Sequence, residues 1–481
     1  MRVEGFDDVG YIEELTLTKR TGEHSCCRFV VKVSSEQGAH LIGKFDAPVK
    51  VKIGDEINSR LVFHGKVQEI LLERGVQCTR IIVTAVSSTV FLLDTEPHTR
   101  LWQNPQKNVG DIVQKLSLNG CQVKLDDALK NAVYEMPFLQ NRETEFALLR
   151  RLAAYAKLHL WVNDLSADAP QVHIASNLRR DVNEPIASND IITLQMGRNT
   201  HGKVARVVTD RHYHFGSILT LEQEAAKYVV TGWQMQFKQG KDQFTLELTE
   251  YKPLSVVKFD LTPLEQPQIL RGKIKDNIDP KHLGRVQIEI DKECAEDMDS
   301  VKTWLNWRTP YAGNESGVVF LPDKGDAADV FFLNGEIYAC AALRKRELAA
   351  ETQNVKDKYI GNNYQQRIFW KEKSLELMSA DSKIFLDKEK IELTVGQAKI
   401  SVDKENITLS NAQGELQLTP QGIIAKTSGD LTLNSGKSLA AMAGDKFSAT
   451  AGGRLALKSG GGMTAASDGN VQIQGTKVEL G

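Results

Sequence analysis

The chain has 481 residues, of which 60 are basic and 62 acidic, so its formal net charge at pH 7 is only −2. This length allows roughly two to four domains with substantial cores, and the balanced charge excludes the basic surface typical of proteins that bind nucleic acid or anionic membranes. The six cysteines show neither CxxC pairs nor Cys/His ligand spacing, so we expect reduced cytoplasmic thiols.

The start of the chain has no targeting pattern. The first twenty residues interleave charged and apolar side chains, whereas a secretory signal peptide needs a continuous apolar stretch. No later segment reaches the roughly 18 to 20 apolar residues that a membrane-spanning helix requires. We therefore expect a protein without a signal peptide that is cytoplasmic at assembly.

The N-terminal half combines strands with one helix. Alternating polar and apolar residues predict strands at 14–18, 28–33, 49–53 and 61–63. Between residues 141 and 157, apolar residues recur at helical spacing on one face, namely Phe146, Leu149, Ala153 and Ala156. Asn141 is the expected N-cap of this helix, and Glu143 and Glu145 lie near its positive end.

Residues 271–344 are typical of a compact all-β domain. Short alternating runs predict strands at 284–290, 301–307, 317–321, 328–333 and 336–340. About five strands in so short a segment suit a small barrel such as the OB fold.

The connection that follows, residues 345–370, is only 26 residues long and is too short for a folded domain. Glu347 and Glu351 lie there at i and i+4, but in a polar stretch they indicate a solvated linker helix rather than a catalytic pair.

The last part of the chain is a repeat of apolar-x-apolar couplets, from Leu375/Leu377 to Val478/Leu480, with a mean spacing of about eight residues. Such a couplet is typical of a strand with one buried face, and the intervening Gly, Asn, Asp and Ser predict turns. A unit this short cannot bury its apolar pair alone, so neighbouring units must stack. One chain would still leave long unpaired edges, which winding several copies together removes.

The couplets change along the repeat. Ile and Leu dominate as far as Leu433, whereas Ala, Gly and Met fill much of residues 436–469. Smaller inward side chains predict a narrowing core, and fourteen couplets at roughly 4.8 Å per stacked strand predict a rod on the order of 70 Å.

Several short motifs follow one another in a fixed order. The barrel segment contains, in turn, Asp279-Pro280, Gly284-Arg285-Val286, Trp304, Ala312-Gly313, Gly317, Leu321-Pro322 and Gly325-Asp326. Upstream lie three further motifs, at residues 99–104, 109–113 and 140–152. Together these motifs resemble the VgrG-type spike and hub family of contractile injection systems. Trp102 stands where members of this family usually have Phe. Residues 327–330 and the shortened turn at 333–336 depart from its pattern, which leaves the subfamily open.

The resemblance implies a mainly β chain with an α+β N-terminal part. It implies a phage-tail-hub-like domain at 1–265, an OB-fold domain at 266–345, a linker at 346–370 and an intertwined triple-stranded β-helix, a trimeric prism, at 371–481. The implied function is that of a structural spike and hub at the tip of the injection apparatus, which nucleates the inner tube and punctures a target envelope. No catalytic, cofactor or metal site is implied.

The same resemblance implies the partners. These are two further copies of the chain, a PAAR-type tip protein, the inner tube protein, baseplate proteins and, as an option, effector cargo, with no nucleic acid. The tip protein would bind Val471, Ile473, Val478, Leu480 and Gly481. As part of the particle, the protein would be delivered into or through the target envelope. A type VI secretion system, an extracellular particle and a tailocin remain open.

Two alternative functions and one possible metal site compete with this prediction. A wall-cleaving spike enzyme would need a lysozyme-like domain with paired carboxylates, for which residues 345–370 leave no room. A trimeric β-helical adhesin would need a secretion signal and a membrane anchor. His212-Tyr213-His214 has the spacing with which some phage spikes hold iron, but that site lies near the needle end, and His282 is the last histidine. We expect both rings on one face of a strand in the hub.

Overall fold

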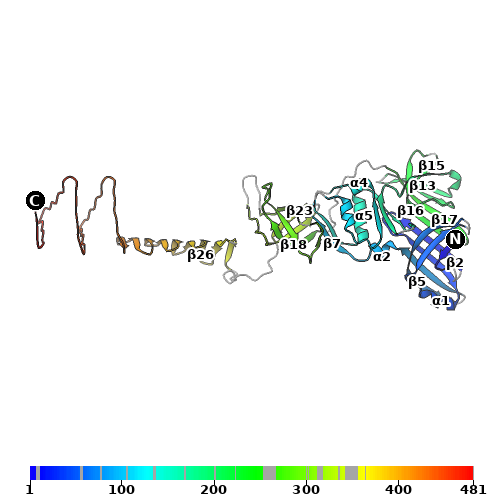
Figure 1. Cartoon of the computed structure of the whole chain (residues 1–481), viewed down its shortest axis with the longest axis horizontal. Coiled ribbons are helices and arrows are strands. Elements are labelled where there is room, and N and C mark those ends of the chain that lie inside the picture. Colours follow the sequence, from blue (N-terminus) through cyan, green and yellow to red (C-terminus); the bar gives the residue numbers. More distant parts are fainter. Residues whose placement is uncertain are drawn as a thin grey trace. The chain divides into compact units, whose positions relative to one another are not determined.

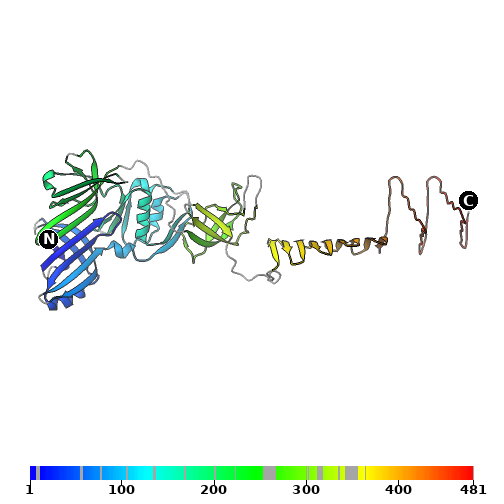
Figure 2. The ribbon, with the colours of Figure 1, turned by 180° about the vertical axis from the view of Figure 1, so that it is seen from behind.

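A computed structural model of the chain describes residues 1–6, 11–54, 58–75, 78–104, 107–133, 137–166, 169–199, 202–222, 224–252, 267–299, 301, 303–310, 318–333, 336–341, 356–362 and 364–479. They belong to two compact units, an N-terminal unit (Met1–Arg346) and a C-terminal unit (Glu347–Gly481). Strands are the main secondary structure of the described residues and helices are few, which confirms the predicted, mainly β fold class (Figures 1 and 2). None of the helices within these ranges has the length and apolarity that a bilayer crossing needs.

A twelve-stranded sheet with two halves dominates the N-terminal unit. The first half has the order β1-β4-β5-β6-β3-β2 and comprises β1 (Arg2–Glu4), β2 (Tyr11–Arg20), β3 (Cys26–Val33), β4 (Pro48–Ile53), β5 (Arg60–Arg74) and β6 (Thr79–Ser87). Helix α1 (Ser35–Ile42) contacts β5 and β6. The four strands predicted in this region are confirmed, with alternate residues buried in β2 and β4 and two adjacent buried residues, Val62 and Phe63, in β5.

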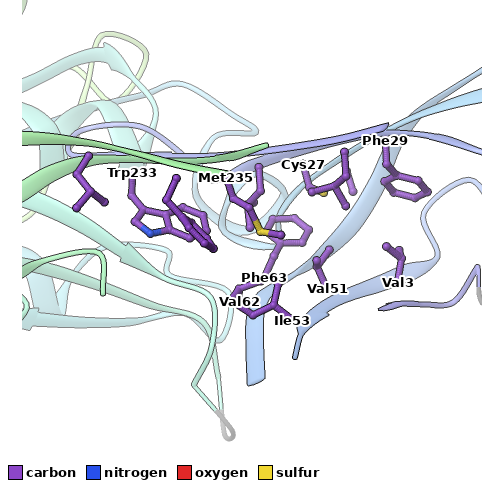
Figure 3. Packing of buried hydrophobic residues seen from close by; sticks show 14 of the residues in the cluster. Val3, Cys27, Phe29, Val51, Ile53, Val62, Phe63, Trp233 and Met235 are labelled. Carbon is purple, nitrogen blue, oxygen red and sulfur yellow. The ribbon is translucent and has the colours of Figure 1, made fainter. Parts of the chain in front are cut away.

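The second half contains β12 (Arg179–Ile186), β13 (Thr193–Asn199), β14 (Gly202–Thr209), β15 (Ser217–Leu221), β16 (Lys227–Lys238) and β17 (Lys241–Glu250), with a 3-10 helix η1 (Ser188–Asp190). Antiparallel pairing of β16 with β2 joins the two halves. Their side chains share one core, in which Trp233 and Met235 lie beside Cys27 and Phe63 (Figure 3).

The helices of the N-terminal unit pack with two small sheets. The helices are α2 (Thr89–Leu93), α3 (Val109–Gln114), α4 (Asp127–Lys130) and α5 (Glu145–Tyr155). One sheet has the order β10-β11-β8, formed by β8 (Gln122–Leu125), β10 (His159–Asn163) and β11 (Gln171–Ala175). The other has the order β20-β7-β9, formed by β7 (His98–Trp102), β9 (Phe138–Glu143) and β20 (Glu296–Asp297). A second core lies between these helices and the two small sheets, and Trp102 and Leu149 are fully buried in it.

The helix predicted between residues 141 and 157 is α5, and its apolar face is confirmed. Phe146, Leu149, Ala153 and Ala156 are all buried, as the helical spacing predicts. The predicted cap is wrong, because the side chain of Thr144 accepts the hydrogen bond from the backbone N–H of Ala147 (3.2 Å). Asn141 belongs to β9 instead, since the strand continues as far as Glu143 before the helix begins.

The predicted barrel is closed and has five strands in the order β18-β19-β21-β23-β22. Its strands are β18 (Gln268–Asp276), β19 (Arg285–Ile290), β21 (Leu305–Trp307), β22 (Ala327–Leu333) and β23 (Glu336–Ala341). The strand predicted at 317–321 is absent from the described residues 318–321, where Val319 and Phe320 are exposed. Strand β18 completes the barrel instead by pairing with β19 and β22.

The C-terminal unit contains a nine-stranded antiparallel sheet in which every strand pairs with the next along the chain. Its strands are β24 (Lys358–Gly361), β25 (Gln366–Trp370), β26 (Ser374–Ser379), β27 (Ser382–Asp387), β28 (Lys390–Val395), β29 (Ala398–Asp403), β30 (Ile407–Ser410), β31 (Gly414–Thr419) and β32 (Gly422–Thr427). Strands β24 and β25 lie within the segment expected to be a linker up to residue 370. The sheet therefore begins earlier in the chain than residue 371.

Beyond β32 the repeat forms no strand within the described residues 428–479, and all of these residues are exposed. The trace follows wide loops there (Figure 1). The strands predicted from Leu431 onward are thus not formed within a single chain. Three of the couplets there contain Ala, namely Leu439/Ala441, Phe447/Ala449 and Met463/Ala465, and isolated hairpins with so little apolar area to bury are marginal in water.

Candidate functional site

A buried network centred on Arg100 connects three parts of the N-terminal unit. The Arg100 guanidinium donates to Glu145 Oε1 (2.7 Å) at the start of α5 and to Gln140 Oε1 (3.2 Å) in β9. It also donates to Ser117 Oγ (3.1 Å) and to Glu296 Oε2 (3.2 Å), which lies in β20. The motif at residues 99–104 and the motif at 140–152 therefore contact each other through the ion pair of Arg100 and Glu145.

A second arginine, Arg151 within helix α5, binds the preceding strand β9. Arg151 donates to both oxygens of Glu143, at 2.8 and 2.7 Å, and to the carbonyl oxygen of Leu139 (2.7 Å). Its guanidinium also lies 4.7 Å from the centroid of the Phe138 ring. This forked arrangement fixes the helix against the strand that precedes it.

The Asp279-to-Arg285 motif forms the loop between β18 and β19. Asp279 accepts backbone hydrogen bonds from Lys281 and Leu283, both at 3.0 Å, and two more from the Arg285 guanidinium at 2.9 and 2.7 Å. The hydrogen bonds from Arg285 hold the pKa of the Asp279 carboxyl well below its usual range. Gly284 has a φ of +68°, a conformation that favours glycine.

The Gly325-Asp326 motif makes the turn that enters β22. The backbone N–H of Gly325 donates to the carbonyl of Ile274 and the carbonyl of Asp326 accepts from the N–H of Ile274, both at 2.8 Å. The Asp326 side chain also accepts from the backbone N–H of Asp323 (2.9 Å). These bonds tie the turn to strand β18. The motif residues Ala312, Gly313 and Gly317 lie outside the described residues.

The couplets of the C-terminal sheet form one continuous apolar surface, which we call the couplet ladder. Each couplet lies directly opposite the next, as in the pairs Leu377↔Ile384, Ile384↔Leu393, Leu393↔Ile400, Ile400↔Leu409, Leu409↔Leu416 and Leu416↔Ala425. These side chains stay substantially exposed, for example 40% for Leu393 and 43% for Ile400. An exposed apolar surface of this extent indicates a face that another molecule covers.

The opposite face of the same sheet carries ion pairs. Glu376 accepts from Lys371 (2.9 Å) and lies 3.0 Å from Lys383. Burial acts to raise the pKa of Glu376, but the hydrogen bonds from these two lysines outweigh it and the pKa is lowered. Glu392 pairs in the same way with Lys390 and Lys399, and the bond from Lys399 is the main cause of its lowered pKa. Alternation along the strands therefore separates an apolar face from a charged one.

The corners between strands use the predicted turn residues. The side chains of Asp387, Asp403 and Asn411 each accept hydrogen bonds from the backbone N–H groups two and three residues further on. Such turns satisfy backbone donors that would otherwise face solvent at each reversal. At another corner, Gly396 has a φ of +56°.

Comparison with known proteins agrees with this geometry. Residues 270–343 match the family of type VI secretion system and phage-baseplate injector OB domains. A solved E. coli component of the type VI secretion system, described as structurally similar to the T4 bacteriophage tail proteins gp27 and gp5, aligns with a TM-score of 0.50 and 10% identity over 70% of this chain and 98% of that one. A PdpA-VgrG complex aligns with a TM-score of 0.53 and 10% identity over 87% of this chain and 94% of that one. A half-lidded Francisella PdpA-VgrG complex aligns with a TM-score of 0.52 and 10% identity over 87% of this chain and 84% of that one.

The chain has the fold of a VgrG-type spike protein. The match of the barrel to the injector OB domains coincides with the segment that holds the Asp279 and Gly325 motifs. No curated protein sequence gave a significant match. The VgrG-type resemblance is therefore carried by the barrel sequence and by the fold.

The residues predicted to bind a tip protein are only partly described. Val471, Ile473 and Val478 are exposed and lie outside any strand, whereas Leu480 and Gly481 lie outside the described residues. Their role stays a prediction. The sequence-based prediction missed the alternating lysine and glutamate residues of the opposite face, which the charged residues between the couplets could have indicated.

The remaining candidates are dispersed. His212 and His214 lie in the loop between β14 and β15 rather than on the predicted strand, although both rings face Arg60, whose Nη1 donates to Nδ1 of His212 (3.2 Å). Within the described ranges no group of three or more His, Cys, Asp or Glu residues could hold a metal ion. Glu347 and Glu351 lie outside these ranges. All six cysteines have free thiols.

Proposed function

We propose that this protein is the trimeric spike and hub at the tip of a contractile injection apparatus. The couplet ladder carries the proposal, since an apolar face that runs without interruption through β26–β32 requires a partner with the same repeat length. A second and third copy of the chain meet this requirement, because three identical ladders can face one axis. The lysine and glutamate residues of the opposite face would then lie toward water.

The same arrangement explains how the spike would transmit force. Each strand of the C-terminal sheet is hydrogen-bonded to both neighbours except at the ends of the sheet. In a closed trimer the couplets from Leu431 onward would gain hydrogen-bonding partners from other copies, so the stack would continue. Dense backbone hydrogen bonds around a closed core suit a part that is loaded in compression.

The N-terminal unit would serve as the base of the spike. Its barrel is joined to the helical part by the Arg100 network and by the parallel pairing of β20 with β7. Force applied to the barrel would therefore pass to the helical part of the N-terminal unit. In this proposal the N-terminal unit organises the inner tube and baseplate proteins, and a PAAR-type protein binds residues 471–481.

A pair of matched variants tests the trimer. Ile400→Asp places a charge in the couplet ladder, whereas Ser401→Asp places the same charge one residue away on the opposite face. We expect the mass in solution to be three times the chain mass of 53.5 kDa for the wild type and for Ser401→Asp, and to fall for Ile400→Asp, since an unpaired buried carboxylate is costly. A monomeric wild type, or an Ile400→Asp variant with the mass of a trimer, would contradict the proposal.

The proposal assigns no enzymatic activity to the protein. Purified wild-type protein should leave a peptidoglycan suspension turbid over the time in which a lysozyme control clears it. Clearing by the protein, retained after an additional purification step, would instead favour a wall-cleaving spike.

A further inference from the structure

The large sheet of the N-terminal unit contains the same five-stranded arrangement twice, once in the blue and once in the green part of Figure 1. The first arrangement has the order β4-β5-β6-β3-β2, and the second has the order β15-β16-β17-β14-β13. All neighbouring strands in both are antiparallel, and equivalent strands follow one another in the same order along the chain. Strand β5 is therefore equivalent to β16, and β2 is equivalent to β13.

The equivalence extends to single residues. The pairing of β5 with β6 skips Gln68, and the pairing of β16 with β17 skips Thr231 at the same place. On one side of these bulges, directly opposite residues form the rows Leu15-Phe29-Val83-Ile70 and Leu194-Val207-Leu246-Trp233. On the other side they form the rows Leu17-Cys27-Ala85-Val67 and Met196-Ala205-Leu248-Val230. All four rows are apolar throughout, so both arrangements have one register and turn the same face to the core.

The two arrangements differ at the outer end of these rows. Leu15 and Leu17 of β2 are 1% and 0% exposed, whereas the equivalent Leu194 and Met196 of β13 are 40% and 47% exposed. Strand β2 pairs with β16 along its second edge, but the second edge of β13 pairs with no strand that the structure describes. All seven residues of β13 are exposed, and neither a proline nor a bulge interrupts it. Such an edge is open to pairing with another chain.

Strand β5 has the complementary gap. Along one edge of β16, strand β15 covers the first part as far as Val229, and β2 covers residues 232–238. Along the equivalent edge of β5, strand β4 covers the first part as far as Lys66. Among the described strands, none pairs with residues 69–74 on that edge, where Leu71 is 49% exposed. The sheet therefore ends in one uncovered strand equivalent to β2 and one uncovered half-strand equivalent to its partner.

We propose that β13 of one copy of the chain pairs with residues 69–74 of β5 in the next copy, in the antiparallel register in which β2 pairs with β16. Leu17 lies opposite Met235 in that junction, so the equivalent register places Met196 opposite Leu72. The contact joins two different surfaces head to tail, and contacts of this kind can close into a ring. The inference rests on the proposed function for the presence of three copies and extends their contact to the N-terminal unit.

The contact requires a second copy and remains secondary to the couplet ladder. Within one chain, six strands separate β5 from β13 in the sheet, a distance on the order of 30 Å at the usual spacing of neighbouring strands. One strand pair is also small beside the roughly 1,200 Å² that stable interfaces bury. The couplet ladder would therefore still be needed to hold the trimer together.

A disulfide trap in the full-length protein tests the register. The double variant with Met196→Cys and Leu72→Cys places two thiols directly opposite each other, within the reach of a disulfide bond. After mild oxidation we expect chains linked in twos and threes on a denaturing gel without reductant, and single chains after reduction. The double variant with Met196→Cys and Glu73→Cys moves the second thiol to the other face of β5 and should stay unlinked. The wild type, with its six free thiols, and both single variants should stay unlinked as well.

The outcomes separate this contact from the trimer itself. A wild type with the mass of three chains, together with a Met196→Cys and Leu72→Cys variant that gives no cross-link, would overturn this inference and leave the proposed function standing. A monomeric wild type would contradict both. A cross-link in the Met196→Cys single variant would show that β13 pairs with itself, which also overturns the inference.

Hydrogen exchange on the wild type provides the decision if the double variant does not fold. In the trimer, residues 193–199 and 69–74 should exchange as slowly as the equivalent paired segments, residues 14–20 and 232–238. Exchange at least about tenfold faster than in these segments, as expected for uncovered edges, would refute the pairing.

Discussion

Arg100 and Glu145 form a buried ion pair with an Nη1–Oε1 distance of 2.7 Å, and each side chain is only 4% exposed. The two residues belong to motifs more than forty positions apart in the chain, and the same guanidinium also reaches Glu296 beside the barrel. The pair therefore fixes helix α5 to β7 and connects the helical part of the N-terminal unit to the barrel.

The first prediction concerns this pair. Arg100→Met should lower the free energy of unfolding of the N-terminal unit by about 3–5 kcal/mol, because Glu145 would remain buried without its cation. Urea unfolding followed by Trp fluorescence measures the change. The exposed pair of Arg20 and Glu247, with a distance of 3.2 Å, provides the control, since Arg20→Met should cost less than about 1 kcal/mol. Similar losses in both variants would show that the buried pair has no special role.

The second prediction concerns the loop between β18 and β19. Asp279→Asn should lower the melting temperature of the protein, because an amide cannot accept both Arg285 hydrogen bonds and both backbone hydrogen bonds. Arg285→Lys should have a smaller effect, since it keeps the charge and loses only the fork. Differential scanning calorimetry compares the two, and a larger loss for Arg285→Lys would argue against the role given to Asp279.

Much of this fold could be predicted from the sequence. The couplets of the C-terminal repeat determine both where each strand lies and which face of the sheet each side chain occupies. A register slip by one residue would place Leu393 or Ile400 on the charged face. The four early strands and the face of α5 follow from the same kind of periodicity. The barrel motifs were identifiable because their glycines and aspartates occupy turns with fixed geometry, as Gly284 and Asp279 show.

Other features depend on contacts that no local pattern reveals. The start of α5 was misplaced because Asn141 and Thr144 are both good caps, and the pairing of β9 with β7 decides between them. A cavity beside Arg60 is lined by residues from five strands and from several loops, so no spacing in the sequence indicates it. The strands expected from Leu431 onward do not form in the described residues 428–479, and in the proposed trimer other copies would supply their partners.

The third prediction concerns pH. Burial is the first cause that lowers the pKa of His24 to about 4, and Asp94, whose Oδ2 lies 3.6 Å from Nε2, only partly offsets it. His173 and His212 are lowered in the same way. Below about pH 6.5 the unfolded chain binds protons that the folded chain does not yet bind, so stability is highest above that pH and falls as the pH drops towards 4.

For one such histidine the loss by about pH 4.5 is on the order of 2 kcal/mol. Thermal unfolding at pH 7.5, 6.0 and 4.5 should therefore give falling midpoints. His24→Gln should flatten this dependence, whereas His40→Gln, at an exposed position, should not. A pH profile of His24→Gln that matches the wild type would show that His24 does not contribute.

The last prediction concerns the proposed tip. Val471 and Ile473 are alternate residues in the couplet pattern, so in a trimeric prism both would face inward, and Gln472 and Gln474 would face outward. Replacing Val471 and Ile473 by Asp, or deleting residues 471–481, should abolish co-purification of a PAAR-type protein while the trimer mass is retained, because the couplets of β26–β32 are untouched. Replacing Gln472 and Gln474 by Asp adds the same charge to the opposite face and should leave co-purification unchanged. Retention of the PAAR-type protein by the deletion variant would exclude residues 471–481 as its binding site. Loss of the trimer in the deletion variant would show that these residues are needed for assembly of the trimer.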